Sequence, residues 1–145
     1  MRSADRSPVV VRPATLREAT AVLELWRDAD AVAGATDDPA AIRALLGRDP
    51  GALLVAELRG RLVGCLIAAF DGWRGNMYRL AVHPAHRGRA IGAQLIQAGE
   101  DRLRATGARR VTALVVSEDA RAAAIWRRAG YGRDRRIGRF VKNLG

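Results

Sequence analysis

The chain has 145 residues, the length of one globular domain, and 49% of them are hydrophobic, enough to bury a full core. No apolar run approaches the ~20 residues that span a bilayer, and the N-terminal stretch contains no apolar signal-peptide segment, so we expect a cytoplasmic protein without membrane contact. The net charge of +10 favours anionic partners such as phosphates, acidic substrates or nucleic acid, although arginines on solvent-exposed helix faces would give the same total.

The N-terminal part of the chain predicts one strand and two helices. Residues 9–14 are mostly apolar and β-branched, which is typical of a short strand. Thr15 and Glu18 have the spacing of a capping box, and apolar residues recur at helical spacing as far as Trp26. A second, shorter helix is expected to begin at Pro39, because proline suits the first turn of a helix.

Three strands are expected next, as an antiparallel meander. Residues 51–72 hold two apolar runs around Arg-Gly-Arg, so Gly60 is expected at the turn of a hairpin. A second turn signal at residues 71–76 leads into a strand over residues 76–82. The single cysteine, Cys65, lies in one of the apolar runs. It cannot form an internal disulfide, and we expect it to be a packed thiol of the core.

The C-terminal half alternates helices and strands. A helix is expected over residues 89–105, closed by Gly107, and residues 109–116 predict a buried strand. Residues 118–129 predict another helix, which Gly130 ends, and residues 131–143 predict one final strand or a loose hairpin. A strand, helix, strand order implies a right-handed crossover and a parallel pair of strands.

These elements predict an α+β fold in the order β-α-α-β-β-β-α-β-α-β. Its sheet should be mixed and mostly antiparallel, with a parallel central pair and helices on both faces. We expect a single domain over residues 1–145, with residues 1–7 flexible.

The turn before the helix at residues 89–105 combines glycines with basic side chains. Gly88 and Gly92 let the chain turn tightly and let a ligand reach the backbone, and Arg87 and Arg89 add cationic donors. The N–H groups at a helix start have no partner within the helix, and the helix dipole makes that end positive. The segment is therefore suited to bind a pyrophosphate, although the same letters are compatible with an ordinary tight turn.

Two motifs carry a resemblance to a known family. The stretch RGRAIG at residues 87–92 matches the pattern Q/R-x-x-G-x-G/A, with Ala90 where a glycine is usual, a substitution that is comfortable only at negative φ. The stretch EDARAAAIWRRAGY at residues 118–131 parallels N-x-x-A-x-x-x-Y-x-x-x-G-F through Asp119, Ala122, Trp126, Gly130 and Tyr131. The chain resembles the GCN5-related N-acetyltransferase (GNAT) family from residue 9 to about residue 141, in element order as well as motifs.

The resemblance implies an acetyl-CoA-dependent N-acetyltransferase that takes no metal. A primary amine would attack the thioester directly, without a covalent enzyme intermediate. The strand residues Leu80, Ala81 and Val82 would contact the pantetheine arm, and a backbone N–H there would polarise the thioester carbonyl. The pyrophosphate would lie against Arg87, Gly88, Arg89, Ala90, Ile91, Gly92 and Ala93, and Asp119 would complete the cofactor-binding set.

The catalytic groups depart from the family pattern. An alkyl amine has a pKa near 10 and arrives protonated, yet Asn76 stands where histone-modifying relatives carry a glutamate. Glu57 is the nearest alternative base, although a strand residue can equally lie on a solvated face. Trp126 replaces the usual tyrosine acid; an indole donates a hydrogen bond but transfers no proton, and a core aromatic is the other interpretation. Tyr78 could contact the acceptor or serve as the acid.

The acceptor site would be walled by the first two helices, residues 31–39 and residues 70–76. Asp37, Asp38 and Asp71 in these loops could attract a cationic amine, or could serve as helix caps and turn residues. An exposed Trp73 would indicate a substrate wall or a subunit contact. His83 and His86 have no acidic or cysteine partner close in sequence, so they do not indicate a metal site.

Two other functions compete with catalysis. The missing tyrosine and strand carboxylate are compatible with an acetyl-CoA-binding module that is catalytically silent. A nucleic-acid-binding domain is disfavoured, because basic and aromatic residues do not alternate and no recognition motif is present. The acceptor is expected to be a small-molecule amine or a peptide or protein amine, and the resemblance is compatible with a homodimer through the last strands.

Overall fold

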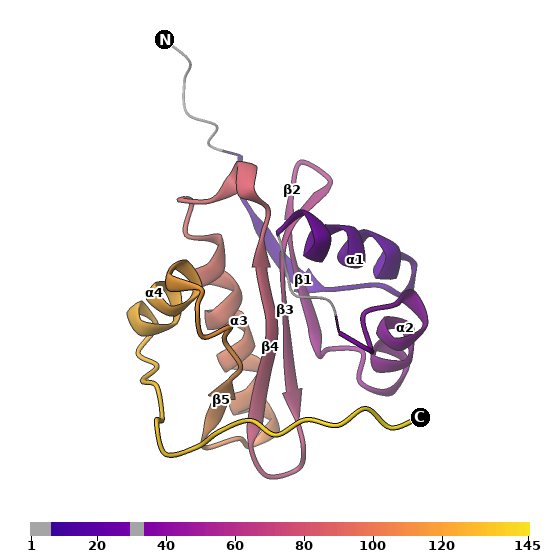
Figure 1. Ribbon diagram of the computed structural model, residues 1–145. Helices are drawn as coiled ribbons and strands as arrows, with labels where there is room; N and C mark the ends of the chain where they lie inside the picture. Colours follow the sequence, from indigo (N-terminus) through magenta and orange to yellow (C-terminus); the bar gives the residue numbers. More distant parts are fainter. Residues whose placement is uncertain (1–6, 30–33) are drawn as a thin grey trace.

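The computed structural model describes residues 7–29 and 34–145. Within these ranges five strands form one sheet in the order β1-β2-β3-β4-β5 (Figure 1). The strands are antiparallel to one another except for the parallel pair of β4 and β5. They are β1 (Val10–Pro13), β2 (Leu53–Leu58), β3 (Arg61–Phe70), β4 (Gly75–Val82) and β5 (Val111–Ala113). The expected mixed α+β sheet is confirmed.

Helices cover both faces of the sheet (Figure 1). On one face lie α1 (Ala19–Asp28), entered through the short 3-10 turn η1 (Leu16–Glu18), and α2 (Pro39–Arg48). On the other face lie α3 (Ile91–Thr106) and α4 (Ala120–Arg128), and a second 3-10 turn, η2 (Pro84–His86), joins β4 to α3. Among the described residues, no helix is both long and apolar enough to cross a membrane.

The sheet separates two hydrophobic clusters, because successive strand residues point to opposite faces. In β2, Leu53 and Val55 pack toward α1 and α2, whereas Leu54 and Ala56 pack toward α3. Cys65 of β3 is fully buried in the first cluster, as the sequence predicts, and burial raises the pKa of its thiol to about 12. This central part of the sheet is therefore closed to solvent on both faces.

The expected strand after α4 is not formed. Residues 131–145 form no strand, and the backbone of residues 132–145 is exposed along its whole length. This tail carries three glycines and five cations, Gly132, Gly138, Gly145, Arg133, Arg135, Arg136, Arg139 and Lys142. Repulsion between like charges and the backbone entropy of glycine oppose pairing with a strand as short as β5. The parallel pair consequently lies at the edge of the sheet rather than at its centre.

Two stretches about which the sequence makes predictions fall partly outside the described residues. Residues 1–6 of the stretch expected to be flexible, and residues 31–33 of the loop expected to wall the acceptor site, are not among them. Ser7 is described, and its hydroxyl accepts a hydrogen bond of 2.9 Å from Arg59 Nε.

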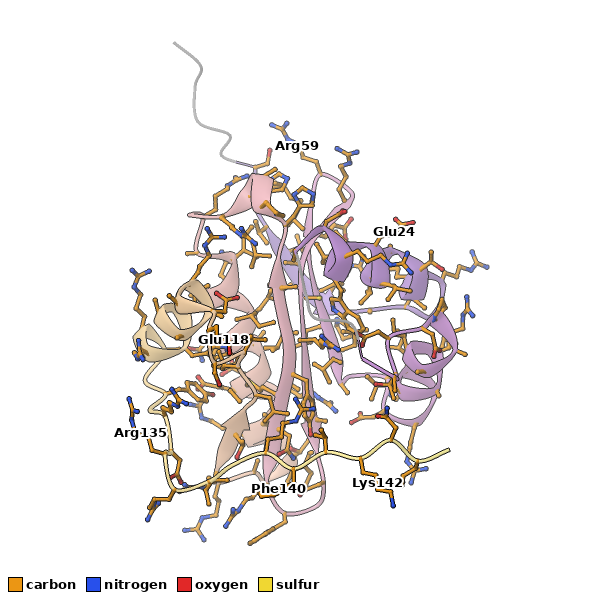
Figure 2. The ribbon with its side chains drawn as sticks, in the orientation of Figure 1. Glu24, Arg59, Glu118, Arg135, Phe140 and Lys142 are labelled. Carbon is orange, nitrogen blue, oxygen red and sulfur yellow. The ribbon has the colours of Figure 1, made fainter. Side chains whose placement is uncertain are left out.

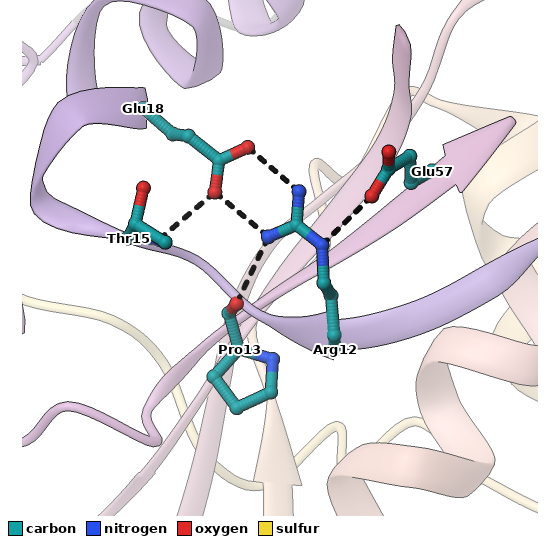
Figure 3. Close-up of polar contacts among 5 residues, drawn as sticks. All are labelled: Arg12, Pro13, Thr15, Glu18 and Glu57. Carbon is teal, nitrogen blue, oxygen red and sulfur yellow. Dashed lines mark hydrogen bonds and ion pairs between the residues drawn. The ribbon is translucent and has the colours of Figure 1, made fainter. Parts of the chain in front are cut away.

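A polar network joins β1, β2 and the start of α1 (Figure 3). The Arg12 guanidinium donates to both carboxylate oxygens of Glu18 and, through Nε, to Glu57, all at 2.8 Å. The Thr15 N–H donates to Glu18 Oε1 at 2.9 Å, which is the reciprocal half of the expected capping box. The hydrogen bonds from Arg12 lower the pKa of Glu18 to about 2, so this carboxylate stabilises the fold only while it is ionised.

We predict that Glu18→Gln removes part of the acid sensitivity of the fold. The pKa of Glu18 is lower in the folded chain than the ordinary value of 4.5, so its stabilisation is complete above pH 4.5 and is lost as the pH falls toward 2. Between pH 6 and pH 3 the wild type should lose about 2 kcal/mol more free energy of unfolding than Glu18→Gln, measured by urea denaturation. Glu24→Gln on the exposed side of α1 is the control and should follow the wild type; equal pH slopes for all three proteins would contradict the prediction.

Candidate active site

The strands β4 and β5 separate partway along their length. In the described chain they pair at three positions, the last being Met77 with Ala113, and the Leu114 N–H then donates to the Met77 carbonyl at 3.0 Å. Residues 78–82 continue β4 while paired only with β3. The side of β4 that faces away from β3 is therefore an open backbone edge, and an extended ligand can bond to it as a strand would.

A β-bulge at Arg79 accompanies this separation. Cys65 pairs with Ala81 and Ile67 pairs with Tyr78, so β4 holds one more residue than β3 between the two positions. Arg79 adopts a φ of +56°, a left-handed conformation that is rare for a residue with a side chain. Bulges bend a strand and increase its twist, and this one turns β4 away from β5 while its bonds to β3 are kept.

The loop after β4 leads directly into the N-terminus of α3. Gly88 has a φ of +83°, and Arg87 and Gly88 are exposed. Ala90 is the residue before the helix and offers no side-chain cap, and the first helical bond runs from the Gln94 N–H to the Ala90 carbonyl at 3.1 Å. The N–H groups of residues 91–93 thus have no partner within the helix. This donor set, on a helix of sixteen residues, fits a pyrophosphate.

Two residues of the loop behave differently from the sequence expectation. Ala90 has a φ of +58°, so the condition of a negative φ is not met and its β-carbon is strained. Gly92 is buried, and a β-carbon there would lie 3.3 Å from Ile125 Cγ2 of α4. The structural requirement for glycine at this position is therefore the close packing of α3 on α4.

The strand residues expected to face the pantetheine arm lie along the open edge. Leu80 and Val82 pack into the cluster beneath α3, whereas Ala81 packs into the cluster beneath α1. Tyr78 is half-buried and immediately follows Met77, the last paired residue. Since Met77 points toward α3, alternation places Tyr78 on the face covered by α1 and α2. Tyr78, residues 80–82 and the loop of residues 87–93 therefore follow one another from the open edge of β4 to the start of α3.

Glu57, the proposed base, lies elsewhere. It is on β2, two strands away from β4, which is about 10 Å at the usual strand spacing. Its carboxylate is paired with Arg12 at 2.8 Å. Because this carboxylate is held by the Arg12 guanidinium, away from the open edge of β4, the geometry gives Glu57 a structural part in the Arg12 network.

Trp126 and Asp119 both serve the packing of α4. Trp126 is buried, and its ring lies 4.9 Å from that of Tyr131 in an edge-to-face arrangement, as the core interpretation predicts. The Tyr131 hydroxyl donates to Glu100 at 2.8 Å, and burial together with that contact raises the pKa of Tyr131. Asp119 caps α4 by accepting from the Ala122 N–H at 2.9 Å.

The acidic and histidine residues of the loops have local partners. Asp38 caps α2 through the Ala41 N–H at 2.8 Å. Asp71 accepts two turn N–H groups at 2.8 Å, which lowers its pKa. Both match the cap and turn interpretation. Of the two histidines, His83 accepts from the Ala85 N–H at 3.1 Å and its ring lies 5.8 Å from that of His86, so both are loop residues.

Sequence reasoning missed Arg79 and its partner. The Arg79 guanidinium donates to both oxygens of Asp37 at 2.8 and 2.6 Å. Nothing in the alternation of apolar and polar residues marks an inserted residue in a strand, and the pair is separated by 42 residues in sequence. The sequence offered Asp37 as an acid that attracts an amine or as a cap or turn residue, whereas the structure gives its carboxylate a cationic partner.

Comparison with known proteins agrees with this arrangement. The model of the acetyltransferase (GNAT) family matches residues 19–131. The chain belongs to the GNAT family. An acetyltransferase of Pectobacterium atrosepticum is 40% identical over 99 residues, which make up 68% of this chain and 70% of that protein. A second, from Photorhabdus laumondii, is 40% identical over 98 residues, 68% of each chain. The protein is thus an acetyltransferase.

Solved structures show the same fold at low identity. Diaminobutyrate acetyltransferase EctA of Paenibacillus lautus, in complex with L-2,4-diaminobutyric acid and coenzyme A, has a TM-score of 0.70 and 22% identity, covering 83% of this GNAT chain and 73% of its own. The PaiA N-acetyltransferase of Thermoplasma acidophilum, in complex with coenzyme A, has a TM-score of 0.74 and 12% identity, covering 83% and 87%. The sheet and helix arrangement of this acetyltransferase is therefore the GNAT fold.

We predict that Ala90→Gly stabilises this acetyltransferase. Glycine adopts a φ of +58° without strain, so the free energy of unfolding should rise by about 1 kcal/mol in urea denaturation. Ala44→Gly, at an exposed position within α2, is the matched control and should lower it by about 1 kcal/mol. If the two variants were destabilised equally, the left-handed Ala90 would not be a source of strain.

Proposed function

We propose that this acetyltransferase transfers an acetyl group from acetyl-CoA to a primary amine. The observation that carries the proposal is one continuous segment of donors. The open edge of β4 at residues 78–82 leads through Gly88 to the unpartnered N–H groups of α3. Structural neighbours support it, since the EctA structure contains coenzyme A with an amine-bearing amino acid and another neighbour is an aminoglycoside N-acetyltransferase in complex with coenzyme A.

The co-substrate would be held by backbone more than by side chains. Leu80, Ala81 and Val82 would bond to the pantetheine amides along the open edge, and a backbone N–H there would stabilise the oxyanion that develops on the thioester carbonyl. Acetyl-CoA supplies the activated acetyl group. Its pyrophosphate would lie against the loop and helix start, formed by Arg87, Gly88, Arg89, Ala90, Ile91, Gly92 and Ala93. Asp119 would act indirectly, by capping the helix that packs on Gly92.

In the proposed reaction, water takes the proton of the amine and Tyr78 gives a proton to the leaving thiolate. The acceptor amine attacks the thioester directly and gives its proton to water, since Glu57 is paired with Arg12 and lies two strands away. Tyr78 would protonate the leaving thiolate, because its phenol is on the strand beside the open edge. Trp126, the other candidate, is buried against Tyr131 and cannot transfer a proton.

The acceptor is proposed to be a primary amine, either of a small molecule or of a peptide or protein. It would approach from the face covered by α1 and α2, where Tyr78 lies. We place the reaction in the cytoplasm, where acetyl-CoA is made and consumed. One wall of the acceptor site would be the loop of residues 31–39. The structure describes residues 34–39 of this loop, and residues 31–33 lie outside the described ranges.

The test measures binding and turnover separately. Acetyl-CoA at ~100 times its dissociation constant should add ~2.7 kcal/mol of stability in a thermal shift, and thiol release should follow with at least one amine or peptide of a panel. Arg87→Ala should weaken acetyl-CoA binding about tenfold or more, the loss of a charged hydrogen bond, whereas Arg43→Ala on the exposed side of α2 should bind normally. Tyr78→Phe should bind acetyl-CoA normally and release thiol at least about tenfold more slowly.

Each outcome is decisive for one part of the proposal. Absence of a thermal shift would contradict acetyl-CoA binding. A shift without thiol release from any acceptor would favour the alternative, a silent acetyl-CoA-binding module. Full turnover by Tyr78→Phe would remove the phenol from the mechanism and leave solvent as the source of the proton.

We also propose that the protein forms a homodimer through its C-terminal tail. The tail leaves Ile137, Phe140, Val141 and Leu144 exposed, at 72, 99, 73 and 89% respectively. Figure 2 shows Phe140 and Lys142 on the tail where it crosses the molecule. Trp73, at the turn between β3 and β4, is 70% exposed, and among the described residues β5 is an edge strand of the sheet. Exposed apolar side chains and an edge strand each favour association.

Light scattering of the eluting protein tests this proposal. The wild type should elute as a dimer, and Ile137→Asp/Phe140→Asp should elute as a monomer that keeps its acetyl-CoA thermal shift, because the replaced side chains contact little within one chain. Arg135→Ala, which leaves the apolar residues of the tail in place, should remain dimeric. A monomeric wild type would contradict the proposed dimer.

A further inference from the structure

Arg79, the strained residue of the bulge, also forms a partly buried ion pair with Asp37. Arg79 Nη2 lies 2.8 and 2.6 Å from the two Asp37 oxygens, and the two side chains are 26 and 10% exposed. The same Asp37 carboxylate accepts the Gly34 N–H at 2.8 Å. The pair therefore joins residues 34–37 to β4, two residues after Met77, the last residue of β4 that pairs with β5.

The bulge is fastened a second time through its backbone. The Arg79 carbonyl accepts a hydrogen bond from the Cys65 thiol at 3.7 Å, and Cys65 Sγ accepts the Trp26 indole N–H at 3.1 Å. The Arg79 guanidinium also lies 5.3 Å from the centroid of the Trp26 ring. Trp26 and Cys65 are buried, so α1 and β3 hold one side of the bulge while Asp37 holds the other.

A second ion pair, between Arg102 and Asp49, serves as the comparison. Arg102 Nη2 lies 2.6 Å from both Asp49 oxygens, and Arg102 Nε donates to the Ala68 carbonyl at 3.0 Å. It joins α3 to the segment before β2, but Arg102 has regular helical backbone and lies away from the open edge of β4. Arg79 differs on both counts. A left-handed conformation strains a residue that carries a side chain, and it persists where surrounding contacts fix it, often at functional sites.

We propose that Arg79 is a positioning residue for the acceptor amine. This inference rests on the proposed acyl transfer. Through Asp37, Arg79 fixes the loop of residues 34–38, one wall of the acceptor site, at a set distance from the bulged strand that carries the thioester. Acceptor and thioester then meet in one geometry, and small displacements of reacting groups reduce rates strongly. Asp37, being paired, orients this wall and does not attract the amine by its own charge.

Two variants break the pair from opposite sides. Asp37→Asn removes the charge and keeps the shape, and Arg79→Gly removes the side chain where glycine suits a φ of +56°. Both should raise the KM for the acceptor about tenfold while the KM for acetyl-CoA stays within about twofold of the wild type. The double variant should be no worse than either single one, since both lose the same contact. Arg79→Lys should recover part of the acceptor KM.

The matched control is Asp49→Asn, which breaks the Arg102 pair. It should lower the free energy of unfolding by an amount similar to Asp37→Asn and leave the acceptor KM unchanged. If Asp37→Asn and Arg79→Gly are folded and their acceptor KM equals that of the wild type, the proposal is overturned. A wild type that binds acetyl-CoA but releases no thiol would instead contradict the proposed function.

Amide hydrogen exchange tests the coupling without turnover. In the proposal, Asp37→Asn loosens both ends of the contact, so exchange should quicken at residues 34–37 and also at residues 79–81, whereas Asp49→Asn should change neither stretch. Faster exchange confined to residues 34–37 would show that the loop is not coupled to the bulge and would overturn the inference even in an inactive protein.

Discussion

The extra residue in β4 is the constraint on which the site depends. Because β4 stays bonded to β3 through the bulge at Arg79 and pairs with β5 only as far as Met77, the backbone of residues 78–82 is left as an open edge. A strand without a bulge would either continue beside β5 and close this edge or lose its bonds to β3. The open edge therefore results from local backbone geometry and requires no conformational change.

Strain at both ends of one segment defines the proposed acyl-CoA site. Arg79 and Ala90 have φ values of +56° and +58°, and the strand end and the turn before α3 lie between them. Neither conformation is favourable for a side-chain-bearing residue. A packed core backs this segment, since Leu95, Ile96 and Met77 are buried where α3 lies on the sheet. The well-packed core offsets the local strain, and α3 both closes that core and presents its N-terminal N–H groups to the ligand.

Local patterns in the sequence predicted the order of elements through α4, although the strand expected to be buried over residues 109–116 is only Val111–Ala113 and partly exposed. The capping spacing of Thr15 and Glu18, the apolar alternation of the meander and the glycine-basic turn at residues 87–92 all act within a few residues. The GNAT resemblance gave the order of elements through α4. The final strand was wrong, because the sequence pattern does not report how charge and glycine weaken pairing to a three-residue edge strand.

Contacts between residues far apart in the chain could not be predicted from the sequence. Arg12 and Glu57 are 45 residues apart, and Arg79 and Asp37 are 42 apart. Their pairing depends on which strands become neighbours and where a bulge falls, neither of which changes the alternation of polar and apolar residues. The same limit applies to the roles of the acids: Glu57 was suggested as a base by its place in the chain, and only the fold shows that Arg12 binds it.

Amide hydrogen exchange with and without acetyl-CoA tests the central claim most directly, because it reports on the open edge itself. The claim predicts added protection at residues 78–82 and at residues 91–93, the N–H groups without a helix partner, while residues 75–77, already paired with β5, stay unchanged. Protection that rises elsewhere and leaves residues 78–82 as they are in the free protein, with acetyl-CoA bound, would contradict it.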